Sequence, residues 1–289
     1  MERSSIKTII IIVLLVLNLF LVGNLIFRGA YNENLEADEL SDLAGILNKS
    51  DVTLGDGALP AEVVRSNLLE TRRDEKKEEQ VASCLLGTCV KEEFGGGMVE
   101  YLSDSGSAIF RRGFEFEITF KKDGVYGMSS EITSKTLASH LKAAGFDLGG
   151  DMEPVDSEDG FSFKITQYVS KLPIENVGIT AVVRPDDTVV LSGKWLFSYG
   201  VADERALSMS VASLVLPFVS GLKSEGVELS RINGSGYGFY LEQSSTGGFE
   251  LVPACTFDTD KGRFTVNALR FSILERAKTD TAETYRETP

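Results

Sequence analysis

The sequence of 289 residues is 43% apolar, so the chain is long and hydrophobic enough to bury a core. Its 29 basic and 43 acidic residues give a net charge of −14, which would repel the phosphates of a nucleic acid. One histidine and three cysteines exclude haem, iron–sulfur clusters and most metal sites, and leave the commonest general base nearly absent. We therefore expect a folded, non-catalytic protein with no nucleic acid partner, no metal and no cofactor.

The N-terminal segment is predicted to cross a membrane. Residues 9–27 contain no charge, and sixteen of these nineteen residues are Ile, Leu, Val or Phe, a length that spans the hydrocarbon layer as a helix. Arg28 stands where a signal peptidase needs a small side chain, so we expect an uncleaved anchor. Arg3 and Lys7 precede the anchor and acidic residues follow it, which predicts a cytoplasmic stub at 1–8 and an extracellular remainder in a single-pass cell-membrane protein.

One face of this predicted helix is a candidate contact for a second membrane helix. Asn18 is a polar side chain at membrane depth, where hydrogen bonding to a neighbouring helix is favourable. The residues that share its face at 100° per residue complete the candidate partner-binding set, which is Ile11, Leu14, Asn18, Val22 and Leu25.

Residues 28–97 are predicted to form a helical membrane-proximal region. Apolar residues at helical spacing indicate a short amphipathic helix over 35–49, with acidic residues near its start. A second helix is predicted from residue 61 to residue 80, after Pro60. Its charged centre, residues 72–79, mixes both signs at spacings of four and is interpreted as a solvated helix face.

Residues 98–274 are predicted to form an extracellular α+β domain. Helices are expected over 132–144 and 203–222. Each is followed by several segments whose sequence pattern predicts antiparallel strands. This order predicts two related units, each a helix plus an antiparallel sheet. The polar residues 275–289 are expected to be a loose tail. The predicted strands are 98–102, 108–120, 161–172, 176–183, 188–199, 227–232, 238–242, 249–258 and 264–274.

The short motifs of the chain do not combine into a catalytic site. Ser220 and Lys223 have the Ser-x-x-Lys spacing of penicillin-interacting enzymes, but the Ser-Asp-Asn and Lys-Thr-Gly partners are missing. Residues 258–262 imitate the start of a calcium loop without its final glutamate, so a hairpin turn is expected there. His140 is interpreted as a solvated helix residue.

The spacing of Cys84 and Cys89 allows two alternatives. In an oxidising exterior they could close a small loop as a disulfide, or they could remain free thiols, and Cys255 is left unpaired in either case. A zinc site of the three cysteines with His140 is disfavoured, because only one pair has ligand spacing.

Several strings resemble the YycI (WalI) family of two-component-system regulatory proteins from Gram-positive bacteria. Near the N-terminus these are Lys7-Thr8-Ile9 and Leu17-Asn18-Leu19-Phe20-Leu21. Near the C-terminus, Leu251-Val-Pro-Ala254 followed by Phe264-Thr-Val-Asn-Ala268 is similar to the close of that family and to related PepSY-like modules. Cys255 stands where the family usually has tryptophan, and the usual Thr-Gly after Asn-Ala is missing.

The resemblance implies a function and partners. Members are single-span proteins whose membrane helix and YycH-like ectodomain associate with a sensor histidine kinase of the YycG (WalK) type and with a YycH-like protein in cell-wall homeostasis. We accordingly expect a signal-transduction regulator that works in the membrane as a homodimer or heterodimer. The alternative is an anchored extracytoplasmic domain that binds a wall or peptide ligand, or a PepSY-like protease inhibitor.

Overall fold

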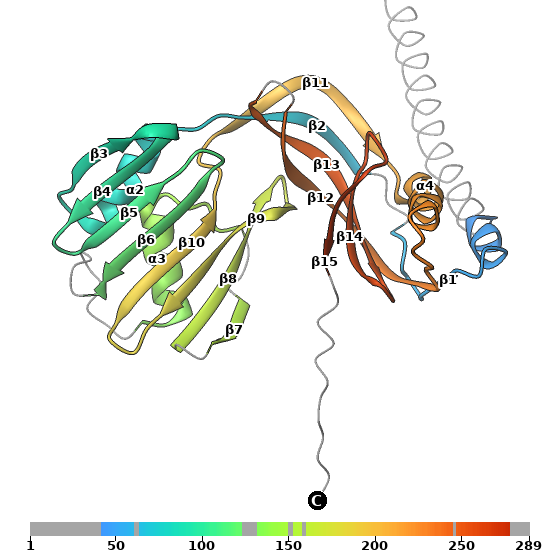
Figure 1. Ribbon diagram of the computed structural model, residues 1–289, viewed down its shortest axis with the longest axis horizontal. Helices are drawn as coiled ribbons and strands as arrows, with labels where there is room; N and C mark the ends of the chain where they lie inside the picture. The colour runs from blue at the N-terminus through green and yellow to red at the C-terminus, as the bar shows by residue number, and fades with distance from the viewer. Residues whose placement is uncertain are drawn as a thin grey trace, which may run out of the picture.

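The computed structural model describes residues 42–60, 64–122, 132–149, 153–157, 160–244 and 247–277. They form an α+β fold of two sheets side by side, each with helices on one face, which confirms the α+β class but not the predicted number of units (Figure 1). The predicted membrane helix, the cytoplasmic stub and residues 278–289 lie outside the described residues. Within the described ranges, no helix is both long and apolar enough to cross a bilayer.

A helix followed by four antiparallel strands in sequential order occurs three times in the described part of the chain. We call these repeats the first, second and third modules. The first module contains α2 (Glu75–Leu86), β3 (Val90–Phe94), the 3-10 turn η1 (Gly95–Gly97), β4 (Met98–Ser103), β5 (Gly106–Phe110) and β6 (Glu115–Lys121). The second contains α3 (Ser134–Ala144), β7 (Glu153–Ser157), β8 (Gly160–Val169), β9 (Leu172–Val183) and β10 (Thr188–Lys194). The third contains α4 (Val211–Ser224), β12 (Arg231–Gln243), β13 (Phe249–Thr259), β14 (Gly262–Asn267) and β15 (Ile273–Ala277).

The first two modules share one antiparallel sheet, because their last strands, β6 and β10, pair with each other. The strand order of this first sheet is β3-β4-β5-β6-β10-β9-β8-β7. Successive side chains of each strand point to opposite faces of this sheet. In β6, Phe116, Ile118 and Phe120 are buried under the helices, while the intervening residues face outward. The core between this sheet and helices α2 and α3 includes Trp195, whose ring lies 5.5 Å from that of Phe146.

The third module forms the second sheet together with strands from outside the modules. Strand β2 (Val64–Thr71) pairs with β13 and with β11 (Tyr199–Met209), while β1 (Thr53–Leu54) runs parallel to β12. Helix α4 and a helix at 42–48 cover one face. In the core beneath α4, the rings of Phe218 and Phe257 stack with centroids 4.4 Å apart.

The two sheets meet at strand β9, which belongs to the first sheet and also pairs in parallel with β12 at Ile174 and Phe239. A third hydrophobic cluster fills this junction and draws on both sheets: Leu69, Phe114, Val169, Ile174, Val177, Leu196, Phe239, Leu241 and Leu251. The junction therefore has a core of its own, which positions the two sheets relative to each other.

The structure corrects three sequence predictions. The predicted helix at 61–80 is wrong over residues 64–71, which form strand β2, and is confirmed only from Glu75, where α2 begins. The predicted helix at 203–222 is also wrong over its first part, because β11 extends to Met209 and pairs there with β2. In both cases long-range strand pairing overrides local helical preference. The third correction concerns the number of units, which is three modules in two sheets rather than two helix-plus-sheet units.

Two predicted boundaries also move. Residues 64–97 are not a separate membrane-proximal region, since β2 lies in the second sheet while α2 and β3 belong to the first module. Residues 275–277 are not part of a loose tail, because β15 pairs with β14 as far as Ala277. The helix predicted at 132–144 is confirmed: Thr133 and Thr136 form a capping box, and Gly145 ends the helix at a φ of 106°.

Candidate functional site

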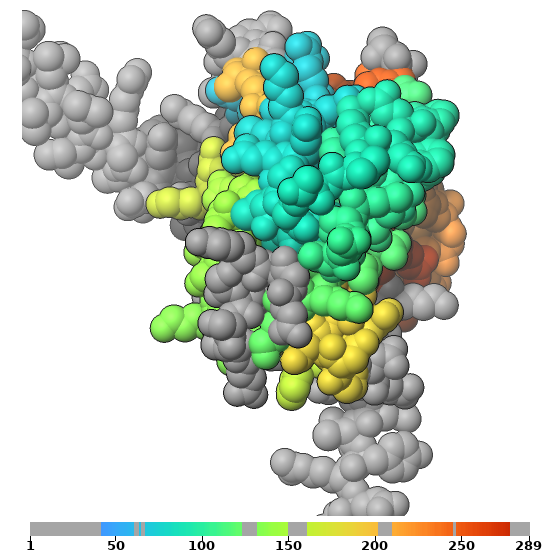
Figure 2. Space-filling model, turned by 90° about the vertical axis from the view of Figure 1, so that its left-hand side faces the viewer, coloured from blue at the N-terminus to red at the C-terminus, as the bar shows by residue number. Residues whose placement is uncertain are grey.

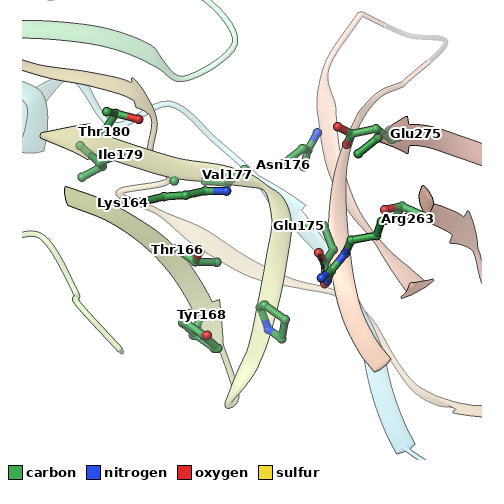
Figure 3. A pocket seen from close by; sticks show the side chains of 14 residues that line it. Lys164, Thr166, Tyr168, Glu175, Asn176, Val177, Ile179, Thr180, Arg263 and Glu275 are labelled. Carbon is green, nitrogen blue, oxygen red and sulfur yellow. Dashed lines mark hydrogen bonds and ion pairs between the residues drawn. The ribbon is translucent and has the colours of Figure 1, made fainter. Parts of the chain in front are cut away.

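A polar cleft of about 530 Å³ lies between the two sheets and is the candidate functional site. Strands β8 and β9 of the first sheet form one wall, and strands β14 and β15 of the second sheet form the other. Figure 3 shows Lys164, Thr166 and Tyr168 on the first wall, with Arg263 and Glu275 across from them. Its walls are therefore regular strands held by two separate cores, and only the junction places them face to face.

Glu175 and Arg263 form an ion pair across the cleft. Glu175 on β9 accepts a hydrogen bond from Arg263 Nη2 on β14 at 3.0 Å, and its side chain is only 11% exposed. Arg263 Nη1 also lies 3.8 Å from Asp258 Oδ1. A Cβ at position 238 would lie 3.0 Å from Glu175 Oε1 and 2.8 Å from the Pro173 carbonyl oxygen, so Gly238 leaves the space that this carboxylate occupies. The pair thus connects the two walls at the base of the cleft.

Burial raises the pKa of Glu175 above its ordinary value, and the nearby Asp258 and Glu275 raise it further, while Arg263 opposes the shift. A folded-state pKa above the unfolded value means that the stability linked to protonated Glu175 is fully present below pH 4.5 and is lost as pH rises through the folded pKa. We therefore expect Glu175→Gln to gain stability relative to wild type as pH rises from 4.5 to 7. Urea unfolding across this range tests the prediction, and parallel stability curves for the two proteins would contradict it.

Tyr240 on β12 adds a second titratable group beside the cleft. Burial raises the pKa of its hydroxyl, and the charge of Glu275 raises it further. Hydrogen bonding to Asn176 and to Glu275 also acts on this hydroxyl. Tyr240 therefore stays protonated at neutral pH, which makes its O–H a donor toward the carboxylate of Glu275.

Two side-chain amides hold the junction beside the cleft by pairing with backbone groups. Asn176 donates to the Leu241 carbonyl at 2.9 Å and accepts from the Leu241 N–H at 2.8 Å, which joins β9 to β12. Gln167 makes the same two bonds with Leu196, at 2.8 and 2.9 Å, and its side chain is buried. Each amide pairs with the backbone N–H and C=O of one residue, and so fixes β12 in the case of Asn176 and the chain between β10 and β11 in the case of Gln167.

The cleft has the properties of a site for an extended polar chain. It offers strand walls, an exposed lysine at Lys164, the exposed acid Glu275 and the Glu175–Arg263 ion pair, so charges of both signs line it. Its one carboxylate with a shifted pKa, Glu175, is neutralised by Arg263. Among the residues that the structure describes, no group of three or more His, Cys, Asp or Glu side chains could hold a metal ion.

A second, more apolar groove of about 660 Å³ lies between α4, the helix at 42–48 and the segment that follows α4. Its apolar lining residues are Leu47, Val52, Leu216, Val219, Val227 and Leu229. Ser220 and Lys223 of the Ser-x-x-Lys motif also line it, with Asp51, Glu228 and Lys261. The motif therefore lines this groove and not the polar cleft between the two sheets.

Of the sequence-predicted site residues that the structure describes, Cys84 and Cys89 line neither pocket. The membrane-helix face of Ile11, Leu14, Asn18, Val22 and Leu25 lies outside the described residues. Cys84 and Cys89 are free thiols in the structure, at the end of α2 and just after it. Cys255 is a core residue buried beneath α4. Burial raises the pKa of its thiol to about 12.

Sequence reasoning missed the residues that build the cleft. Glu175, Asn176 and Gln167 lie within strands of the second module, whereas Arg263 lies within a strand of the third. The only signal in the sequence is that each interrupts a run with strong strand character. Nothing in the spacing indicates which of them meet, because the contacts join residues 65 to 88 positions apart, or 29 in the case of Gln167 and Leu196.

Comparisons with known proteins give distant likenesses only. No family model and no curated protein matches the chain. Among solved structures, the chain is similar to an uncharacterized protein from Eubacterium rectale, with 8% identity and a TM-score of 0.46 over 78% of this chain and 90% of that one. It is also similar to the C-terminal domain of YpeB from Bacillus megaterium, with 11% identity and a TM-score of 0.36 over 72% of this chain and 98% of that domain.

Proposed function

We propose that this protein is a non-catalytic, membrane-anchored extracytoplasmic binding protein that holds an extended segment of another protein in the cleft between its two sheets. The observation that carries the proposal is the cleft itself, which has strand walls and charges of both signs. Its volume of about 530 Å³ is within the range of pockets that enclose a ligand of several residues. Main-chain groups of an extended segment would bond to the polar walls, and Lys164 and Glu275 would select its charges.

The proposed role is regulation of a sensor histidine kinase of the YycG (WalK) type, together with a YycH-like protein. The resemblance of the N-terminal and C-terminal strings to the YycI family supports this choice of partners. The protein would act laterally on the kinase, through its anchor and its ectodomain. Such coupling requires that the protein contact two states of the kinase differently.

A second candidate function is favoured by the apolar groove beside α4. Its lining of leucine and valine side chains suits a small apolar or amphiphilic ligand, which fits the alternative of an anchored ligand-binding domain. This function would need no kinase partner.

The test is a pull-down of the tagged full-length protein from its native membrane in mild detergent. Three forms are compared: wild type, a form whose residues 6–27 are replaced by an unrelated anchor, and Lys164→Glu in the cleft. We expect wild type to recover a sensor kinase and a YycH-like protein, and Lys164→Glu to recover at least about fivefold less, as expected when an attractive charge becomes a repulsive one.

Each form reports a different contact. Loss of the kinase only with the foreign anchor would place the contact in the membrane and contradict the cleft as its site. Recovery of neither partner by wild type would contradict kinase regulation and leave the ligand-binding function as the explanation. Thermal unfolding of Lys164→Glu is the control for folding, and no change is expected because Lys164 is exposed.

A further inference from the structure

Strand β3 is an open edge of the first sheet. It pairs with β4 on one side and ends the strand order among the described residues. All five of its residues are exposed, including Val90 at 65% and Phe94 at 43%. In Figure 1 β3 lies at the outer side of the first module, and Figure 2 shows the surface of that module turned toward the viewer. Exposed edges of this kind can pair with a further strand.

The apolar side chains of β3 stand at its two ends, on the sheet face opposite the helices. Val90 lies beside Leu102, which is 37% exposed, and Phe94 lies beside Met98. Between them, Glu92 lies beside Glu100 on the same face. Lys91 and Glu93 alternate with these residues, face the helix side and form an ion pair at 2.6 Å. The strand Val-Lys-Glu-Glu-Phe therefore has apolar ends and one charge of each sign flanking its centre.

We propose that β3 pairs antiparallel with β3 of a second copy of this chain, with Glu92 at the two-fold axis. In this register Val90 of one copy faces Phe94 of the other, at both ends of the pairing. Lys91 of one copy faces Glu93 of the other, also twice. Opposite charges and apolar pairs directly across two strands both stabilise the pairing. A two-fold axis at Glu92 makes the interface closed, so it yields a dimer and not a fibre.

The same chain already joins two modules by antiparallel pairing of strands. Strands β6 and β10 pair over seven residues, and Lys194 lies 3.5 Å from Glu115 at one end of that pairing. Strand β15, one of the edge strands of the second sheet, is less suited, because its register against β14 shifts between Thr265 and Val266. The self-facing register centred on its Glu275 would also bring no Lys–Glu pair across the interface.

The unfavourable contact in this pairing is at its centre, where like charges meet. The two Glu92 carboxylates would face each other, each with Glu100 beside it, and like charges directly opposite destabilise a strand pair. Five residues also bury less area than a stable dimer in solution needs. Anchoring both copies in one membrane raises their effective concentration, so we expect the dimer in the membrane and weak association in detergent.

Disulfide cross-linking of the full-length protein in its native membrane tests the register. The background carries Cys84→Ser and Cys89→Ser, while buried Cys255 is retained. We expect Glu92→Cys to give a cross-linked dimer on mild oxidation, because facing Cβ atoms lie about 4.5–5.5 Å apart. Val90→Cys alone should give at least about fivefold less, whereas Val90→Cys mixed with Phe94→Cys should restore the dimer. Equal cross-linking of all single variants, or none by Glu92→Cys, would overturn the proposal.

Charge reversal supplies a second measurement that needs no cysteine. Energy transfer between donor-labelled and acceptor-labelled copies in membranes should fall at least about fivefold for Lys91→Glu, because two attractive pairs become repulsive. The double variant Lys91→Glu with Glu93→Lys restores both pairs and should return the signal to wild type, and Glu92→Gln should increase it. Failure of the double variant to recover, with normal thermal unfolding, would contradict the pairing.

Discussion

Gln167→Leu is expected to lower the free energy of unfolding by about 3 kcal/mol. The Gln167 amide supplies both hydrogen bonds of the Leu196 peptide groups, at 2.8 and 2.9 Å, in a region where Gln167 is 2% exposed. Leucine has a similar volume but leaves a buried N–H and a buried C=O without partners, and each such group costs about 1–3 kcal/mol. Chemical denaturation of the purified protein, followed by far-UV circular dichroism, measures the change.

The matched control is Asn176→Leu on the neighbouring strand. Asn176 makes the same pair of bonds with Leu241, but these bonds are only partly buried, so water can replace the lost amide. We expect this control to cost about half as much as Gln167→Leu. A cost for Gln167→Leu below about 1 kcal/mol would show that the Leu196 N–H and C=O find other hydrogen-bond partners. It would contradict the prediction that the Gln167 amide stabilises the junction.

Arg73→Met is expected to lower the free energy of unfolding by about 3 kcal/mol. Arg73 donates from Nε and Nη2 to the two carboxylate oxygens of Glu78, both at 2.8 Å, and the Glu78 side chain is 4% exposed. Arg73 also donates to the Gly97 carbonyl in the turn between β3 and β4. Methionine fills similar space but leaves a buried carboxylate unpaired, which is the costly way to break an ion pair. Thermal and denaturant unfolding measure the loss.

The double variant Arg73→Met with Glu78→Leu separates the ion pair from the packing. It removes both charges, so most of the stability is expected to return. Lys194→Ala, which breaks the more exposed pair with Glu115, is the surface control and should cost less than about 1 kcal/mol. If the double variant remains as unstable as Arg73→Met, the loss comes from packing and from the Gly97 contact, and the buried carboxylate is not its cause.

Arg73 and Leu196, the residue to which Gln167 bonds, lie where the chain passes between the two sheets. Arg73 stands between β2 of the second sheet and α2 of the first module, and Leu196 lies between β10 of the first sheet and β11 of the second. The cleft walls therefore depend on these two crossings. We expect variants at either crossing to reduce partner recovery even though neither residue lines the cleft.

Local sequence signals were sufficient for elements whose contacts are short in range. The alternation of Phe116, Ile118 and Phe120 indicates β6, although the strand predicted over 108–120 is in fact two paired strands, β5 and β6, joined by a turn. Thr133 and Gly145 mark the ends of α3. The turn at Asp258–Gly262 is a hairpin, as predicted, between β13 and β14. These elements need only a period, a cap or a turn to be specified.

Elements that depend on distant strands were not predictable in the same way. Residues 64–71 have a pattern compatible with a helix, yet they form β2 because β11 and β13 pair with them, with Leu69 buried in the junction. The same pairing makes residues 203–209 a strand. Strand preference depends on the neighbours that a segment meets, so a local pattern cannot assign it.

The sequence by itself determined the apolar stretch at 9–27, the α+β class and the hairpin at 258–262, because each of these depends on neighbouring residues. Only the tertiary structure decided that three modules share two sheets, that β9 joins them, and that Glu175 meets Arg263 across a cleft. It also showed β3 as an open edge with self-complementary residues. The physical reason is that these contacts join side chains from distant segments, which only the packing of the three cores brings within hydrogen-bonding distance.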